Sequence, residues 1–114
     1  MKVVINSCYG GFGLSHEAIL RYAELKGIKL FWEGEGGTFD HYYTSKDMKN
    51  SAYFSYRKIK RDDPILVQVV EELNDAANGE YAELSIVEIP DDVDWTVQEY
   101  DGYEHIAEEH RTWY

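Results

Sequence analysis

The residues best suited to binding chemistry lie together in segment 8–15, which reads Cys-Tyr-Gly-Gly-Phe-Gly-Leu-Ser. Glycines let backbone N–H groups approach an anion, and the start of a following helix adds positive potential there. The rings of Tyr9 and Phe12 could stack on a base. The spacing is not a dinucleotide-binding fingerprint, because the third glycine would fall on His16, and it is not a Walker loop. Two interpretations stay open: the glycines cradle a phosphate, or they only permit a tight turn.

Side chains that could catalyse or bind metal are present, but their spacing predicts neither site. Cys8 beside a helix start could act as a nucleophile, yet no motif pairs it with a histidine, so an inert buried cysteine is favoured. In the tail, His105 and His110 are five residues apart, which matches no standard pair of metal ligands. Their neighbours Glu104, Glu108 and Glu109 then indicate a solvated acidic surface. We expect no catalytic residue, no metal and no cofactor.

Two arginines are candidates for gripping a phosphate, because the guanidinium fork binds such groups bidentately. Arg111 is the only basic residue in segment 62–114, where it could equally anchor an ion pair. Arg57 lies between aromatic and basic residues, in a cluster that could equally be the solvated end of a strand. The sequence leaves both alternatives open.

The elements that must position these residues can be predicted from caps and alternation. Residues 2–6 predict a buried strand, and a helix begins after Ser15 and stops at Gly27. A second helix begins with Asp63 as N-cap and Pro64 at its first position, and runs toward 78–79. Further strands are expected at 28–32, 39–43, 52–57, 84–89 and 95–100, with a hairpin turn at 101–102 and a return strand from 103. We predict one α+β or α/β domain over 1–114, with two helices packed on one mixed sheet.

Charge is distributed unevenly over the 114 residues, whose formal net charge is −11. Segment 1–61 has ten basic and six acidic side chains, whereas segment 62–114 has sixteen acidic ones and a single arginine. Such a balance argues against binding duplex nucleic acid but allows a small anion in a locally positive pocket. The opposed halves also suit pairing within the fold or self-association. One cysteine, the lack of a long apolar run and an early polar start predict a soluble cytoplasmic protein without a membrane segment.

The amino-acid sequence of four segments resembles that of small phage proteins of the Thoeris anti-defence sponge family, in its first-described type. The resemblance spans nearly the whole chain and is carried by segments 1–15, 89–95, 99–102 and 110–113. The last of these reads His-Arg-Thr-Trp. Sponges of this family sequester a signal molecule without degrading it.

The resemblance implies a function. The chain is expected to bind a cyclic ADP-ribose-type signal made by host TIR proteins and so to keep the host effector silent. Some family members also bind cyclic oligonucleotides at a separate site, and members assemble as homo-oligomers up to hexamers. Their pockets use arginines for phosphates and aromatic rings for adenine. The residues expected at the ligand are Cys8, Tyr9, Gly10, Gly11, Phe12, Gly13, Arg57, Arg111, Thr112 and Trp113.

Two other functions fit the residues. The chain could be an enzyme that degrades such a nucleotide with a histidine or glutamate of the tail. It could also be an interaction module whose acidic second half mimics nucleic acid and blocks a host protein.

Overall fold

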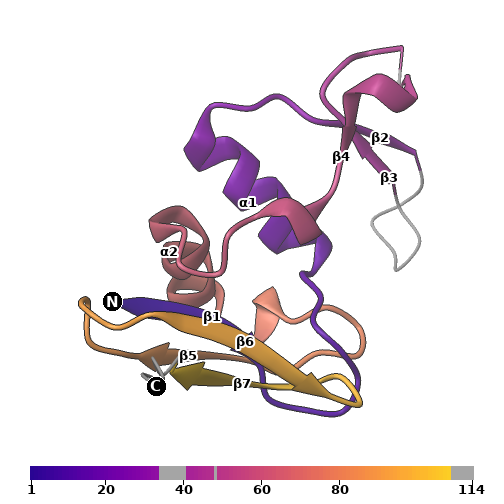
Figure 1. Cartoon of the computed structure of the whole chain (residues 1–114). Coiled ribbons are helices and arrows are strands. Elements are labelled where there is room, and N and C mark those ends of the chain that lie inside the picture. Colours follow the sequence, from indigo (N-terminus) through magenta and orange to yellow (C-terminus); the bar gives the residue numbers. More distant parts are fainter. Residues whose placement is uncertain (34–40, 48, 109–114) are drawn as a thin grey trace.

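Helix α1 (His16–Lys26) follows strand β1 (Lys2–Asn6) in the computed structural model, which describes residues 1–33, 41–47 and 49–108 (Figure 1). The Ser15 hydroxyl accepts a hydrogen bond from the Ala18 N–H at 3.1 Å, so the predicted N-cap is confirmed. Gly27 adopts the left-handed conformation at φ 72° and donates its N–H back to the last turn. The sequence therefore sets both ends of this helix locally.

Helix α2 (Pro64–Leu73) begins as predicted, because the Asp63 carboxylate accepts a hydrogen bond from the Ile65 N–H at 2.9 Å. It ends earlier than predicted. Asn74 has a positive φ of 51°, and the chain continues as a short 3-10 helix, η3 (Asn74–Ala77). The two helices pack against each other, and the Tyr22 hydroxyl donates to Asp63 at 2.7 Å. Their apolar faces form the core together with Val4 of β1. The helix residues in this core are Ala18, Ile19, Tyr22, Ala23, Leu66, Val67, Val69 and Val70.

The α+β class is confirmed, but the described strands form three small sheets in place of one mixed sheet. Every pairing among them is antiparallel. In the first sheet β1 pairs β5 (Leu84–Glu88), with Lys2 opposite Glu88 and Asn6 opposite Leu84. The second sheet has the order β2–β3–β4, from Phe31–Glu33, His41–Tyr43 and Tyr53–Phe54. The third is the hairpin of β6 (Trp95–Tyr100) and β7 (Tyr103–Glu108).

Two strand predictions are wrong in extent. The strand expected at 28–32 begins only at Phe31, because the Ile28 N–H still bonds to helix α1 and Leu30 is buried in the core. The strand expected at 52–57 is only two residues long. Ser55 then caps a 3-10 helix, η2 (Tyr56–Lys58), which carries Arg57 away from the sheet. Part of the predicted strand 39–43 lies outside the described residues.

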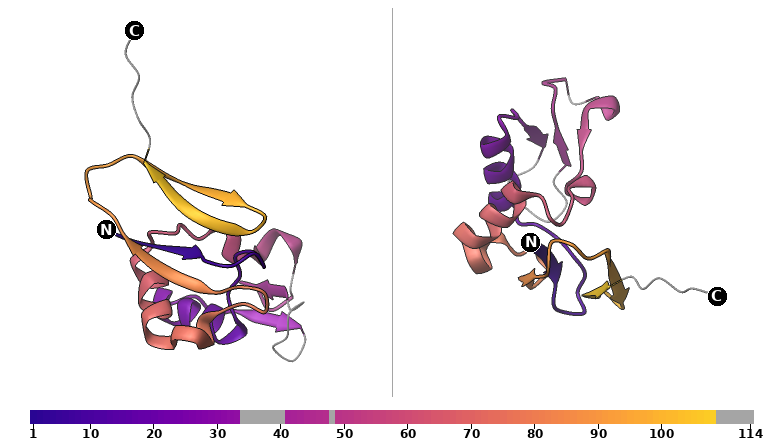
Figure 2. Two further views of the ribbon diagram at one scale, coloured as in Figure 1. Left: turned by 90° about the horizontal axis from the view of Figure 1, so that it is seen from below. Right: turned by 60° about the vertical axis from the view of Figure 1, so that its left-hand side comes forward.

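The hairpin turn at Asp101 and Gly102 is confirmed, since both residues have positive φ (53° and 90°). Seen from below, β1 lies between β5 and this hairpin, and both helices cover the other side (Figure 2). No ladder joins β1 to β7 in the described chain. The Asn6 N–H donates instead to the Glu104 side chain at 2.9 Å. A third short 3-10 helix, η1 (Asn50–Ala52), precedes β4.

Candidate functional site

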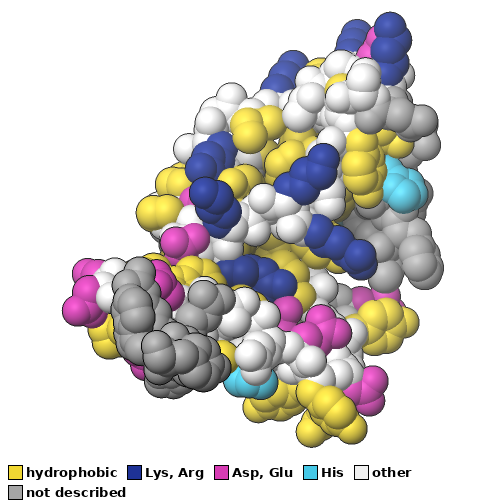
Figure 3. Space-filling view, in the orientation of Figure 1, with side chains coloured by type: hydrophobic (Ala, Val, Ile, Leu, Met, Phe, Trp, Pro, Cys, Tyr) yellow, Lys and Arg dark blue, Asp and Glu magenta, His cyan; other side chains and the backbone are white. Residues whose placement is uncertain are grey.

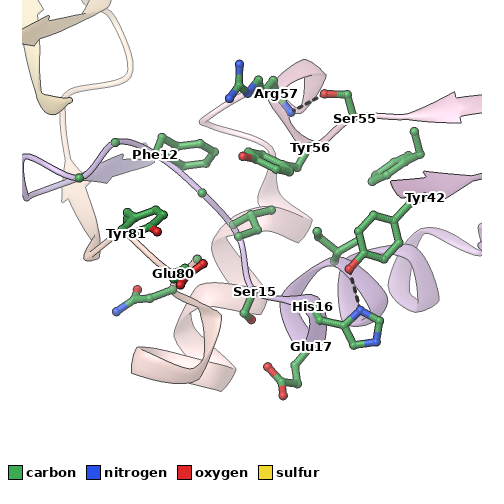
Figure 4. Close-up of a pocket in the computed structure, with 18 of the residues that line it drawn as sticks. Phe12, Ser15, His16, Glu17, Tyr42, Ser55, Tyr56, Arg57, Glu80 and Tyr81 are labelled. Carbon is green, nitrogen blue, oxygen red and sulfur yellow. Dashed lines mark hydrogen bonds between the residues drawn. The ribbon is translucent and has the colours of Figure 1, made fainter. Parts of the chain in front are cut away.

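A cavity of about 750 Å³ lies where residues 8–15, here called the glycine segment, pass between the second sheet and the turn that follows η3 (Figure 4). This volume is in the range of pockets that hold small molecules. Its walls come from five separate stretches of the sequence. The lining includes Gly10, Gly11, Phe12, Gly13, Ser15, His16, Glu17, Tyr42, Tyr53, Ser55, Tyr56, Arg57, Arg61, Gly79, Glu80, Tyr81, Glu99 and Glu104.

The glycine segment has both properties that the sequence left open. Close packing accounts for two glycines: a Cβ on Gly10 would collide with the Tyr81 carbonyl oxygen, and one on Gly79 would lie 2.7 Å from the Gly13 carbonyl carbon. The Gly79 N–H donates to the Gly13 carbonyl at 2.9 Å. The N–H groups of residues 10–13, however, have no acceptor in the described part of the chain. The segment is thus a tight turn that also leaves donors along one wall of the cavity.

Aromatic rings and one arginine line the same cavity. The ring centroids of Phe12 and Tyr56 are 6.0 Å apart and tilted by 49°. Arg57 follows Tyr56 in the sequence. It is exposed and has no carboxylate partner among the described residues. Elsewhere in the lining, the Tyr42 hydroxyl oxygen lies 2.6 Å from ring Nδ1 of His16. Figure 4 shows Arg57 and Tyr56 on one side of the glycine segment and Glu80 on the other.

Cys8 and Tyr9, both predicted to contact ligand, do not line this cavity. The Cys8 sulfur lies 3.3 Å from the Asn6 side-chain oxygen and 3.1 Å from the Tyr81 carbonyl oxygen, and its single S–H can donate to either. Tyr9 points outward, is 68% exposed and packs on Tyr103 with centroids 5.3 Å apart. The remaining predicted contacts at Arg111, Thr112 and Trp113 lie outside the described residues.

Glu104 corrects the prediction of a solvated acidic surface, because it is only 4% exposed. Its two oxygens accept hydrogen bonds from the Arg61 guanidinium at 2.5 and 2.9 Å. The guanidinium carbon lies 3.5 Å from the centre of the Phe12 ring. Nothing local marks this pair, since its members are 43 residues apart in segments of opposite charge. The charge asymmetry was the only signal that could have suggested it.

Asn6 was predicted only as the end of the first strand, yet it connects three segments. It is fully buried. Its side-chain amide donates to the Cys8 and Gly102 carbonyls, both at 2.8 Å, and its oxygen accepts from the Glu83 N–H at 2.9 Å. Every polar atom of the side chain is therefore used inside the fold. Asn6 thus fixes where the glycine segment leaves β1.

The electrostatic balance of the cavity is mixed. Arg61 is matched by Glu104, so Arg57 is the unmatched arginine of a lining that also includes the carboxylates of Glu17, Glu80 and Glu99. On the face shown in Figure 3, basic side chains gather over the helices and the second sheet, and acidic ones over the strands below. An anion would therefore be favoured only at the Arg57 end.

Neither helix of the described chain is long and apolar enough to cross a bilayer. The same residues contain no group of three side chains suited to a metal ion. Comparisons with protein-family models, curated proteins and solved structures find no match to this chain.

Proposed function

We propose that the protein is a phage anti-defence binding protein that sequesters, without degrading it, a cyclic ADP-ribose-type nucleotide signal made by host TIR proteins. The resemblance described under Sequence analysis suggests the ligand. The observation that carries the proposal is the cavity itself, in which uncommitted loop N–H groups, an unmatched Arg57 and two neighbouring rings share one space.

Each part of such a ligand has a matching part of the cavity. A phosphate would accept hydrogen bonds from the Arg57 fork and from the N–H groups of residues 10–13. An adenine ring would pack against Phe12 and Tyr56. Hydroxyl groups of ribose are donors, and the carboxylates of Glu17 and Glu80 are acceptors on the far side. Tight binding needs these contacts and no chemical step.

The acidic lining sets a condition on this proposal. A diphosphate is attracted by Arg57 and repelled by the carboxylates of Glu17, Glu80 and Glu99, all of which are exposed to water. Water and salt screen charges at exposed sites, whereas direct hydrogen bonds act at contact distance. Binding therefore depends on seating the phosphate at the Arg57 end and not on a general positive field.

Sequestration inside an infected cell would keep the TIR signal from its effector. Self-association, up to the hexamers of the resembled family, and binding of cyclic oligonucleotides at a second site belong to the same proposal. Exposed aromatic side chains are consistent with an interface: Tyr9, Tyr81, Tyr100 and Tyr103 are 68%, 65%, 75% and 40% exposed.

The test is recovery of the bound molecule. The protein is incubated with the product of an activated TIR enzyme, separated from free ligand by gel filtration and then heated to release what it holds. Chromatography should return the intact signal in stoichiometric amount. A new product in the released fraction would show degradation, and an empty fraction would favour the acidic interaction module. Ligand at a thousandfold excess over Kd should also stabilise the fold by about 4 kcal/mol.

A further inference from the structure

We propose that Glu104 is a positioning residue for the cavity: through Arg61 it holds the Phe12 ring in the wall where a base would pack. The inference concerns the shape of the cavity, and its consequence for ligand affinity rests on the proposed function. It also gives the β6–β7 hairpin a role in binding, although only Glu99 and Glu104 of that hairpin line the cavity.

The contacts form a continuous chain from the hairpin to the ring. Both Glu104 oxygens bind the Arg61 guanidinium, at 2.5 and 2.9 Å, and one of them also accepts from the Asn6 N–H at 2.9 Å. The guanidinium carbon then lies 3.5 Å from the centre of the Phe12 ring, whose centroid is 6.0 Å from that of Tyr56. All four side chains from Glu104 to Tyr56 line the cavity.

Phe12 needs such support because the contacts of the neighbouring backbone do not fix the direction of its ring. It lies between Gly11, whose φ is 93°, and Gly13, and it belongs to no helix or strand. Its position is therefore set by side-chain contacts. A guanidinium that is fixed by two hydrogen bonds lies flat on a ring much more reproducibly than a free one, because little rotamer freedom remains.

The backbone of the hairpin reinforces this arrangement. The side-chain amide of Asn6 donates to the Gly102 carbonyl at 2.8 Å. A Cβ on Gly102 would lie 2.7 Å from both the Gly11 nitrogen and the Tyr9 carbonyl oxygen, so the turn and the glycine segment are in direct contact. The turn of the hairpin and the start of β7 thus hold the segment that carries Phe12 at two points.

Positioning and simple electrostatics predict opposite results, which makes the inference testable. Glu104 is a negative charge in the wall of a cavity that we propose binds an anion. If it acted only through its charge, Glu104→Gln would free Arg61 and tighten binding. If it acts by positioning, the same substitution weakens binding, because the guanidinium keeps only one neutral amide oxygen in place of two carboxylate oxygens and the Phe12 ring loses its fixed neighbour.

The experiment titrates cyclic ADP-ribose into wild type and three variants by calorimetry. Glu104→Gln and Arg61→Lys should each raise Kd about tenfold or more, because a lysine keeps the charge but not the fork. The matched control is Glu99→Gln, which removes a carboxylate from the same hairpin and the same cavity; it should tighten binding by about two- to threefold. Equal or tighter binding by Glu104→Gln and Arg61→Lys, in variants whose circular dichroism is native, would overturn the proposal.

A second measurement needs no ligand. In NMR spectra of the free protein, the Arg61 side-chain protons should show the upfield shift expected for atoms above an aromatic ring, and Glu104→Gln should remove most of it. An unchanged shift would overturn the positioning role. If cyclic ADP-ribose fails to bind the wild type while the ring-current shift responds as expected, the proposed function fails and the positioning of Phe12 stands.

Discussion

Arg57 and Arg61 are close in the sequence but differ in their charged partners. Arg61 forms a bidentate pair with a buried carboxylate, so its charge is already used within the fold. Arg57 is exposed at the cavity and has no acidic partner in the described part of the chain. A phosphate gains most from the charge that the protein has left unmatched. Arg57 is therefore the arginine to which we assign ligand binding among the described residues.

Reversing this charge should abolish most of the affinity. Arg57→Glu removes a charged fork and adds repulsion, which should cost about 2 kcal/mol or more, at least some 30-fold in Kd. Lys58→Glu is the matched control, because Lys58 is the next residue and equally exposed but does not line the cavity. Calorimetry compares the two variants with cyclic ADP-ribose. Equal losses in both would assign the effect to net charge alone.

The glycines separate into those that the packing requires and those that it does not. Gly79→Ala places a Cβ against the backbone of Gly13, which cannot move without shifting the segment, so unfolding free energy should fall by about 1–3 kcal/mol. Gly13→Ala meets its nearest atoms at 3.7 and 3.8 Å and should change stability by less than about 1 kcal/mol. Urea unfolding monitored by tryptophan fluorescence makes the comparison. The reverse order of stabilities would contradict the packing of these two segments.

At the scale of elements, the parts predicted correctly are those with local causes. Ser15 and Gly27 bound α1, and Asp63 starts α2, because caps act on the adjacent turn. The turn at Asp101 and Gly102 needs only two residues with positive φ. The division of the strands into three sheets was not predictable in the same way, since it depends on pairings between distant segments, such as β1 with β5.

The candidate site was predictable only in part, for the same reason. Segment 8–15 and Arg57 could be identified by residue type, and the structure brings Gly10 to Gly13 and Arg57 to one cavity. The pair of Arg61 and Glu104 could not, because each residue looks like a solvated charge in its own segment. Cys8 and Tyr9 were expected at the ligand because they belong to the segment that carries the family resemblance, but neither lines the cavity.

The contact between the helices should make stability depend on pH in acid. Burial alone would raise the pKa of the Asp63 carboxyl, but hydrogen bonds from Tyr22, the Ile65 N–H and Lys26 outweigh it and leave the pKa below its usual 3.8. A carboxyl with a lowered pKa stabilises the fold above pH 4, and this contribution is lost as the pH falls through the pKa of the folded state.

Asp63→Asn isolates this contribution, because asparagine still caps a helix. The variant should be less stable than wild type by about 1 kcal/mol at pH 7, and the difference should be smaller at pH 2. Asp62→Asn is the control for loss of one charge, since that carboxylate has no hydrogen bond or ion pair in the described chain. Urea titrations at pH 7, 4 and 2 measure the effect. A difference as large at pH 2 as at pH 7 would contradict it.

At the scale of the whole molecule, the net charge of −11 opposes the ligand that we propose. The opposed charges of the two halves of the sequence become separate regions in space, since the basic side chains gather over the helices and the second sheet on the face in Figure 3. Some of these charges pair with each other at the surface, as Lys2 does with Glu71 and Arg21 with Glu72. The remainder is a negative field through which an anionic nucleotide must diffuse.

Salt should therefore speed association, in contrast to a protein that attracts its anion by a basic surface. Raising the ionic strength from 0.02 to 0.3 M shortens the Debye length from about 20 Å to about 6 Å and screens the long-range repulsion. The association rate constant of cyclic ADP-ribose should rise by about two- to fivefold, as measured by stopped-flow tryptophan fluorescence. A rate constant that falls with salt would show that attraction dominates the approach.

The central claim is that the ligand occupies the cavity bounded by the glycine segment, and an NMR titration tests it most directly. Cyclic ADP-ribose is added to ¹⁵N-labelled protein while the backbone amides of Gly10, Gly11, Phe12 and Gly13 and the Arg57 side chain are followed. We predict that these signals shift together and saturate at one ligand per chain, while the signals of Lys2 and Glu88, at the far end of the β1–β5 ladder, stay in place. Saturable shifts confined to other residues, or no shifts at all, would contradict the account.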